Sequence, residues 1–86
     1  MKLQFKLNIT KNNIKNGDPG NAAKCPVALA LKDLGFKDIH VSIDSMSFIT
    51  KNDTEIIVTM PKKVFTFICK FDSDKSVNPF SIIIPL

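Results

Sequence analysis

Residues 17–26 are the part of this sequence whose residue types and spacing are best suited to chemistry. Glycine and other small residues form a predicted loop there, and the loop leads directly into an apolar stretch predicted to be a helix. The first amides of a helix lack intrahelical partners, and the helix dipole places partial positive charge beside them. Small side chains at Gly20, Ala22 and Ala23 would let a ligand approach the backbone. This combination predicts a phosphate-binding site.

Polar and basic side chains near the loop extend the candidate site. Lys24 lies inside the loop, and Lys11 and Lys15 shortly precede it. The predicted ligand-binding residues are Lys11, Lys15, Gly17, Gly20, Asn21, Lys24, Cys25 and His40. The loop is not a P-loop, because no Gly-Lys-Ser/Thr sequence ends it, and it lacks the glycines of a dinucleotide fingerprint. A turn followed by a helix cap is the alternative interpretation.

The excess positive charge of the chain is concentrated around this loop. The net charge is +4, and all twelve basic residues are lysines. Five of these lysines fall within residues 1–24 against a single aspartate, whereas residues 25–86 are neutral in sum. Either an anionic ligand or a solvated lysine-rich face would explain this distribution. Because arginine is absent, any anion must be held by lysines, backbone amides and neutral polar groups.

The two cysteines raise the alternative of thiol chemistry. Cys25 is predicted at a helix N-terminus beside Lys24, an environment that lowers a thiol pKa, and His40 would be the available base. His40, however, alternates with core residues on a predicted strand and faces away from them. We expect Cys25 to cap or pack the helix and Cys69 to be a small core residue. Cys25, Cys69 and His40 cannot by themselves complete a zinc site with four cysteine and histidine ligands. Neither a metal nor a cofactor is expected.

Sequence periodicity predicts the elements that would position the loop. Residues 2–9 alternate between polar and apolar, which predicts a strand with one buried face. Thr10 is expected to cap a single helical turn over residues 11–16, which Gly17 stops. Residues 18–21 have strong turn chemistry.

The remaining chain predicts two helices and four further strands. Pro26 suits the first turn of a mostly buried helix that ends at Gly35. Residues 62–71 form an amphipathic pattern after Pro61, with Thr59 as the expected cap. The predicted strands cover residues 39–43, 47–50, 55–58 and 79–84. The isoleucine run in the last strand predicts cover on both faces or an interface.

Together these elements predict a single α+β domain over residues 1–86. The expected order is β-α-β-β-β-α-β, with a mainly antiparallel sheet packed against two helices. No apolar run approaches the length of a membrane span, and the N-terminal residues alternate rather than form a signal peptide. A soluble, cytoplasmic protein without a membrane partner is expected. A chain of this size, rich in isoleucine and phenylalanine, would also gain stability from forming a homo-oligomer.

Several of these motifs resemble a group of small uncharacterised proteins of tailed phages. The resemblance covers most of the chain and includes the alternating first strand and a Cys-Pro-Val/Ile-Ala-Leu-Ala helix motif. Its matching segments here are residues 10–17, 25–31, 67–72 and 77–80. Small phage proteins of this kind often act against host defence. The resemblance therefore implies a sponge that sequesters a nucleotide immune signal, such as a cyclic oligonucleotide or an ADP-ribose derivative, without cleaving it.

Three other functions are alternatives to this non-enzymatic sponge. The chain could inhibit a host defence enzyme through a sheet edge or through residues 82–84. Weak nucleic-acid binding would use the basic N-terminal part, although the absence of arginine, tryptophan and tyrosine argues against nucleic acid as a partner. A thiol-dependent enzyme would require Cys25. The expected partner is a nucleotide-derived small molecule, captured by the loop and the nearby lysines.

Overall fold

The computed structural model describes residues 4–85 and contains three helices and five strands. In chain order these are β1 (Gln4–Ile9), α1 (Lys11–Asn16), α2 (Pro26–Asp33), β2 (Lys37–Val41), β3 (Ser45–Ile49), β4 (Glu55–Thr59), α3 (Lys62–Asp72) and β5 (Phe80–Pro85). The α+β class is confirmed, and the predicted order holds once the short turn of α1 is counted as a helix. The first residues of the predicted N-terminal strand, 2 and 3, lie outside the described part.

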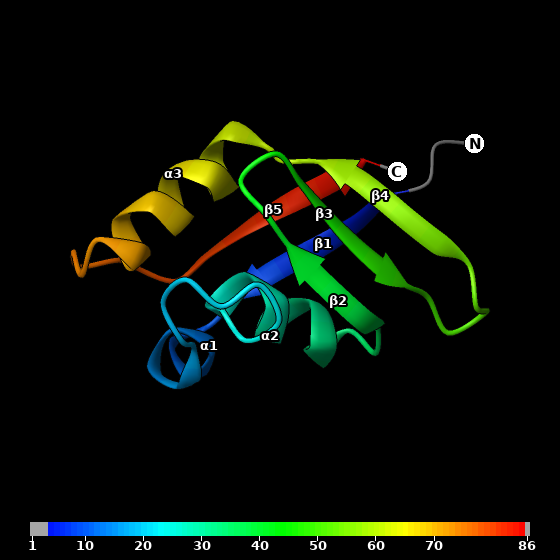
Figure 1. Cartoon of the computed structure of the whole chain (residues 1–86), viewed down its shortest axis with the longest axis horizontal. Coiled ribbons are helices and arrows are strands. Elements are labelled where there is room, and N and C mark those ends of the chain that lie inside the picture. The colour runs from blue at the N-terminus through cyan, green and yellow to red at the C-terminus, as the bar shows by residue number, and fades with distance from the viewer. Residues whose placement is uncertain (1–3, 86) are drawn as a thin grey trace.

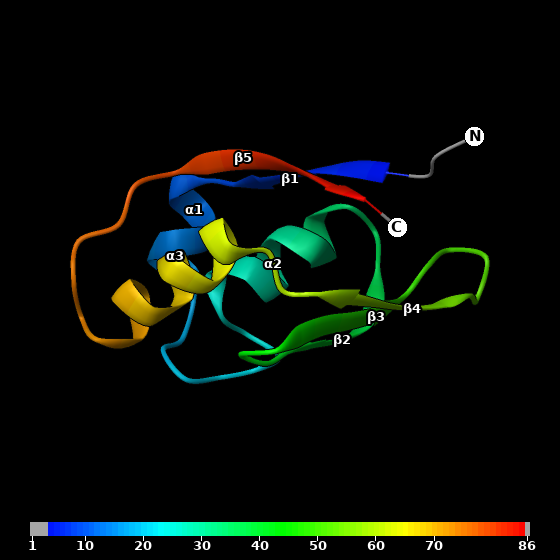
Figure 2. The ribbon, with the colours of Figure 1, turned by 90° about the horizontal axis from the view of Figure 1, so that it is seen from above.

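The strands form two antiparallel sheets where one was expected (Figure 1). β1 and β5 make a two-stranded sheet in which Gln4 lies opposite Pro85. β2, β3 and β4 form a three-stranded meander. Figure 2 shows α2 lying between the two sheets. The single predicted sheet is wrong because α2 occupies the space in which β1 and the meander would otherwise meet.

The sequence of α2 explains this central position. Five of its eight residues are buried: Pro26, Val27, Ala28, Ala30 and Leu31. A helix that is apolar on most of its surface must be covered on more than one side, and α2 contacts both β1 and β2. Pro26 occupies the first turn, where its missing amide hydrogen costs no hydrogen bond. The expectation of a mostly buried helix is confirmed.

Three phenylalanines join the two sheets beyond the end of α2. Phe5 on β1 makes edge-to-face contacts with Phe36 and Phe48, at centroid distances of 5.4 and 5.7 Å. Phe36 and Phe48 stack on each other at 4.3 Å. Aromatic pairs with these geometries contribute about 0.5–1.5 kcal/mol beyond the area they bury. The cluster therefore holds β1 against the strand β3 of the other sheet.

Several local expectations differ from the structure. Ile43 lies in the turn between β2 and β3 and is 66% exposed, although it was expected in a strand. Pro61, rather than Thr59, is the N-cap of α3, because Thr59 remains paired in β4. Cys69 is exposed, so its assignment to the core is wrong. Cys69 follows the buried Ile68 by one position, so the turn of the helix directs its side chain away from the core.

Of the two environments expected for the final strand, cover on both faces is wrong, and an interface stays a prediction. Ile84 is fully buried, whereas Ile83 is 49% exposed. Alternate residues of a strand point to opposite faces, and within residues 4–85 only one face of β5 is covered. Within residues 4–85, no helix is both long enough and apolar enough to cross a membrane.

Candidate functional site

The amides of the predicted phosphate-binding loop already have partners within the chain. The side-chain oxygen of Asn21 accepts from the amides of Ala23 and Lys24 at 3.0 and 3.1 Å. The Cys25 amide donates to the Asn21 carbonyl oxygen at 2.9 Å. The expectation that these amides are unpaired is therefore wrong. An Asx turn at Asn21 takes the donors that would have bound a phosphate.

Cys25 completes this closed arrangement at the start of α2. Its sulfur is the N-cap of the helix and accepts from the Ala28 amide at 3.5 Å. Burial raises the pKa of the Cys25 thiol above its ordinary value, and this effect exceeds the opposing effect of hydrogen bonds from the backbone amides. The thiol pKa is therefore not lowered as the sequence predicted, because Cys25 is buried whereas the neighbouring Lys24 faces solvent. The predicted capping role is confirmed.

Packing and backbone conformation explain why glycine occupies two positions of the loop, without any role in ligand binding. A side chain at Gly17 would put its Cβ 2.6 Å from Cδ of Pro26, so only glycine allows the loop to pack against the start of α2. Gly20 has a positive φ of 70°, which glycine adopts without strain. The Gly20 amide donates to the Asp72 carboxylate at 2.9 Å, which ties the loop to the end of α3.

A small cavity of about 170 Å³ lies beside the loop. Gly20, Asn21 and Cys25 line it together with Asp72, the only charged residue of its lining. A carboxylate at this position disfavours an anion. The lining of this cavity therefore contains no basic side chain, and the amides of Gly20 and of residues 23–25 are already paired within the chain.

The remaining predicted site residues do not gather at this cavity. Lys11 and Lys15 are exposed on the short helix α1, and Lys24 is exposed in the loop. His40 is exposed on β2 opposite Ser47, and neither it nor the three lysines line the cavity. The structure brings together only Gly20, Asn21 and Cys25 of the eight predicted residues.

A larger groove of about 660 Å³ lies between α3 and residues 76–80. Basic, aromatic and neutral polar side chains form its lining, which contains no acidic residue: Lys62, Lys63, Thr66, Phe67, Lys70, Ser76, Val77, Asn78, Pro79 and Phe80. Cavities of about 300–1,000 Å³ are typical for small-molecule ligands. The groove therefore has the size and charge to hold an organic anion.

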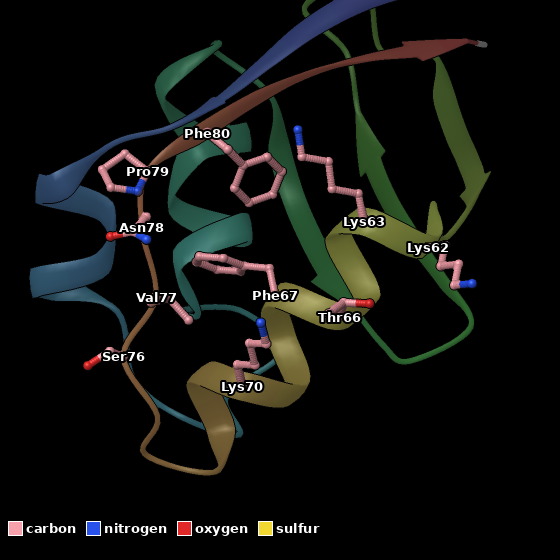
Figure 3. A pocket seen from close by; sticks show the side chains of 10 residues that line it. All are labelled: Lys62, Lys63, Thr66, Phe67, Lys70, Ser76, Val77, Asn78, Pro79 and Phe80. Atoms are coloured by element: carbon pink, nitrogen blue, oxygen red, sulfur yellow. The ribbon is translucent and has the colours of Figure 1, made fainter.

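Helix periodicity explains why α3 presents these residues together. Lys63, Thr66, Phe67 and Lys70 follow a spacing of three, one and three residues, which places them on one face of a helix. Figure 3 shows that Phe67 and Phe80 project from the two opposite walls of the groove, whereas Lys62 and Ser76 point away from its centre. α3 thus supplies the positive charge, and residues 76–80 close the opposite side.

The two aromatic rings meet between the walls of this groove. Phe67 and Phe80 lie 5.2 Å apart between ring centroids, with their planes tilted by 56°. The ammonium nitrogen of Lys63 lies 5.0 Å from the centroid of the Phe80 ring. This contact holds a positive charge directly beside an aromatic surface. A ligand with an anionic group and a planar group would meet both features here.

Sequence reasoning missed this groove for two reasons. Residues 25–86 are neutral in sum, which conceals the three lysines grouped on α3. Phe67 and Phe80 follow core periodicities, and Phe67 is buried in the core with Phe80 packed against it, so neither residue indicates a ligand in the sequence. The spacing of Lys63, Phe67 and Lys70 on one helix face was the available signal. Comparison with protein-family models, curated proteins and solved structures found no match for this chain.

Proposed function

We propose that this protein binds a phosphate-bearing nucleotide in the groove between α3 and residues 76–80, without chemical turnover. The observation that carries the proposal is the convergence of two lysines, Lys63 and Lys70, and two phenylalanines on one groove without any acidic lining residue. The lysines would hold the phosphates, and the base would pack against the half-buried Phe80 ring, which the buried Phe67 ring supports from below. The ligand class expected from the sequence is thus retained, while its site moves from the loop to α3.

Physical complementarity supports a ligand that is both anionic and planar. Lysine holds phosphate as a point charge, and a charge-assisted hydrogen bond contributes about 1.5–3 kcal/mol. Stacking of a base on an aromatic side chain contributes about 1–3 kcal/mol. A free inorganic phosphate would use only the first of these contributions, and an uncharged nucleoside only the second.

The chemistry of the lining supports binding rather than catalysis. Among its residues, Thr66 and Ser76 carry hydroxyl groups, but the lining includes no histidine, cysteine, aspartate or glutamate. A hydroxyl nucleophile needs an adjacent base to be activated. We therefore propose a sequestering role, which agrees with the sponge function implied by the resemblance to tailed-phage proteins. Two segments of that resemblance, residues 67–72 and 77–80, contribute residues to opposite walls of the groove.

Ligand binding is tested by thermal unfolding and calorimetry of the purified protein. The panel consists of cyclic dinucleotides, ADP-ribose, inorganic phosphate and uncharged nucleosides. A nucleotide present at a hundred times its Kd is expected to raise Tm by about 15 °C, because binding only to the folded state adds about 2.7 kcal/mol of stability. Phosphate and nucleosides should produce smaller shifts. Recovery of the intact nucleotide after denaturation, identified by mass spectrometry, would show binding without turnover.

Matched lysine variants distinguish the groove from the loop. Lys63→Gln with Lys70→Gln is expected to weaken nucleotide binding at least tenfold, because each substitution removes a charge from the groove. Lys24→Gln removes the same charge from the loop and should leave affinity unchanged. A loss of affinity in Lys24→Gln with none in the α3 double variant would place the ligand at the loop and contradict binding in the groove. If no nucleotide of the panel binds the folded protein, the proposal is wrong.

A further inference from the structure

The two outer strands of the three-stranded sheet differ in how their free edges are protected. Natural proteins blunt such edges with charges, bulges or covering loops, because an open edge invites another strand. At β2, the register shifts between Lys37 and His40. The Val41 amide also donates to the carbonyl oxygen of Ala22 at 2.9 Å, so the loop covers part of this edge. β2 is therefore a poor template for a further strand.

β4 is less protected within the described part of the chain. Its sequence, Glu-Ile-Ile-Val-Thr, contains neither lysine nor proline, and its one charged residue is Glu55 at its start. Its register with β3 runs without a bulge, and β3 is its only neighbour in the sheet among residues 4–85. Ile57, at the centre of the strand, is 68% exposed. β4 thus presents a regular edge with an exposed isoleucine at its centre and a single charge at one end.

The hydrogen-bond register shows which backbone groups of β4 face outward. The Met60 amide donates to the Asp44 carbonyl oxygen, and the Thr50 amide donates to that of Thr54, both at 2.9 Å. Hydrogen-bonded and non-hydrogen-bonded pairs alternate along an antiparallel ladder. Met60 and Thr54, which flank β4, are in hydrogen-bonded pairs with the residues that flank β3, and residues 56 and 58 follow by alternation. Residues 55, 57 and 59, with Ile57 opposite Ser47, therefore belong to the non-hydrogen-bonded pairs. Their amides and carbonyl groups therefore point away from β3.

We propose that β4 pairs antiparallel with β4 of a second copy of this chain, about a two-fold axis at Ile57. In this register Ile57 lies opposite Ile57 of the partner subunit, and Glu55 lies opposite Thr59 of the partner subunit. Every outward backbone group then meets its complement, and no charge faces a like charge. A second copy can therefore complete this edge with all of its outward backbone groups paired and Ile57 packed on Ile57 of the partner subunit, and a second copy is the proposed occupant.

The surroundings of β4 add apolar surface to this pairing. A groove of about 430 Å³ borders the strand, and none of its lining residues is charged: Ile57, Val58, Thr59, Met60, Pro61, Ile83 and Pro85. The exposed Ile83 of β5 lies in this lining. Strand pairing at β4 would cover part of this groove. The dimer would join two three-stranded sheets into one continuous sheet of six strands.

Sedimentation velocity of the full chain over a concentration series tests the dimer. The unmodified protein is expected to sediment as a dimer and Ile57→Lys as a monomer, because two ammonium groups would meet at the axis. Ile43→Lys is the matched control, since Ile43 is equally exposed at 66% but lies in a turn away from the edge, and it should remain dimeric. Circular dichroism checks that each variant is folded.

A second variant tests the register and does not depend on disrupting the strand. Thr59→Lys places an ammonium group opposite Glu55 of the partner subunit, twice in each dimer. The dimer dissociation constant is expected to fall about fivefold, as two exposed ion pairs of ordinary strength predict. The proposal is overturned by an unmodified protein that stays monomeric at every concentration. It is equally overturned if Ile57→Lys stays dimeric or if Thr59→Lys weakens association.

Discussion

At the scale of single residues, Cys25 shows how burial decides between reactivity and structure. A cysteine at a helix N-terminus near a lysine has two features of an activated thiol. Here the sulfur is buried and accepts from the Ala28 amide, so it satisfies the helix instead of facing a substrate. The raised pKa of the Cys25 thiol follows from that burial. Position along the helix alone therefore does not make this cysteine a nucleophile.

The Cys25 thiol is expected to make stability fall at alkaline pH. Because its pKa in the folded state lies above the ordinary value of 9.0, the folded state binds the proton more tightly than the unfolded chain. Its contribution to stability is therefore complete below pH 9.0 and declines as pH rises through the folded-state pKa. Urea unfolding at a series of pH values measures this decline.

Two serine variants isolate the contribution of this thiol. Cys25→Ser replaces the capping sulfur with a capping oxygen and removes the titrating group, so its alkaline decline should be smaller than that of the unmodified chain. Cys69→Ser changes an exposed thiol and should leave the decline unchanged. Equal declines in the unmodified chain and in Cys25→Ser would show that the buried thiol does not contribute.

At the scale of elements, α1 depends on side-chain contacts for its stability. A helix of six residues is too short to form alone in water. Asn13 is its buried polar residue, and the Asn13 side-chain oxygen accepts from the Thr10 amide at 2.9 Å. The side-chain amide of Asn13 donates to the Asp33 carboxylate at 3.0 Å. One side chain thus caps α1 and ties it to the end of α2.

Asn13→Ala is expected to lower the free energy of unfolding by about 1–3 kcal/mol, because it leaves the Thr10 amide and the Asp33 carboxylate without these partners. The urea midpoint should fall while the slope stays constant. Asn12→Ala changes an exposed neighbour on the same helix and should shift stability by less than about 0.5 kcal/mol. Equal losses in both variants would contradict the role given to Asn13.

The sequence predicts elements of this fold well and their partners poorly. Alternation over residues 4–9 and the capping signals at Thr10 and Pro26 are local, and the structure confirms them. The pairing of β1 with β5 depends on residues more than 70 positions apart, as in the Asn8–Ser81 hydrogen bond. The prediction of a phosphate site at the loop is wrong for the same reason. The Asp72 carboxylate accepts from the Gly20 amide although the two residues are 52 positions apart, and no local pattern indicates that contact.

At the scale of the whole molecule, the phenylalanine cluster connects sheets that share no strand. Phe48 is fully buried and contacts both Phe5 and Phe36. Phe48→Ala is expected to cost about 3–5 kcal/mol, as a large-to-small core substitution does. Domains of this size are stable by only about 5–15 kcal/mol, so the loss would be a large part of the total. The urea midpoint measures it.

Phe65→Ala is the control for this substitution, because Phe65 is 39% exposed and lies outside the core cluster. It should lower stability much less than Phe48→Ala. If the two variants lose equal stability, the contact between the sheets does not depend on the buried cluster.

The pairing of the first strand with the last also constrains synthesis in the cell. Among the elements of residues 4–85, β1 leaves the ribosome before the others, and its one strand partner there, β5, is translated after them. Until then, one edge of β1 has no strand to complete its backbone hydrogen bonds. The nascent chain therefore passes through a stage in which this edge is open to mispairing or to chaperones. Final closure of the native structure must occur after translation of β5.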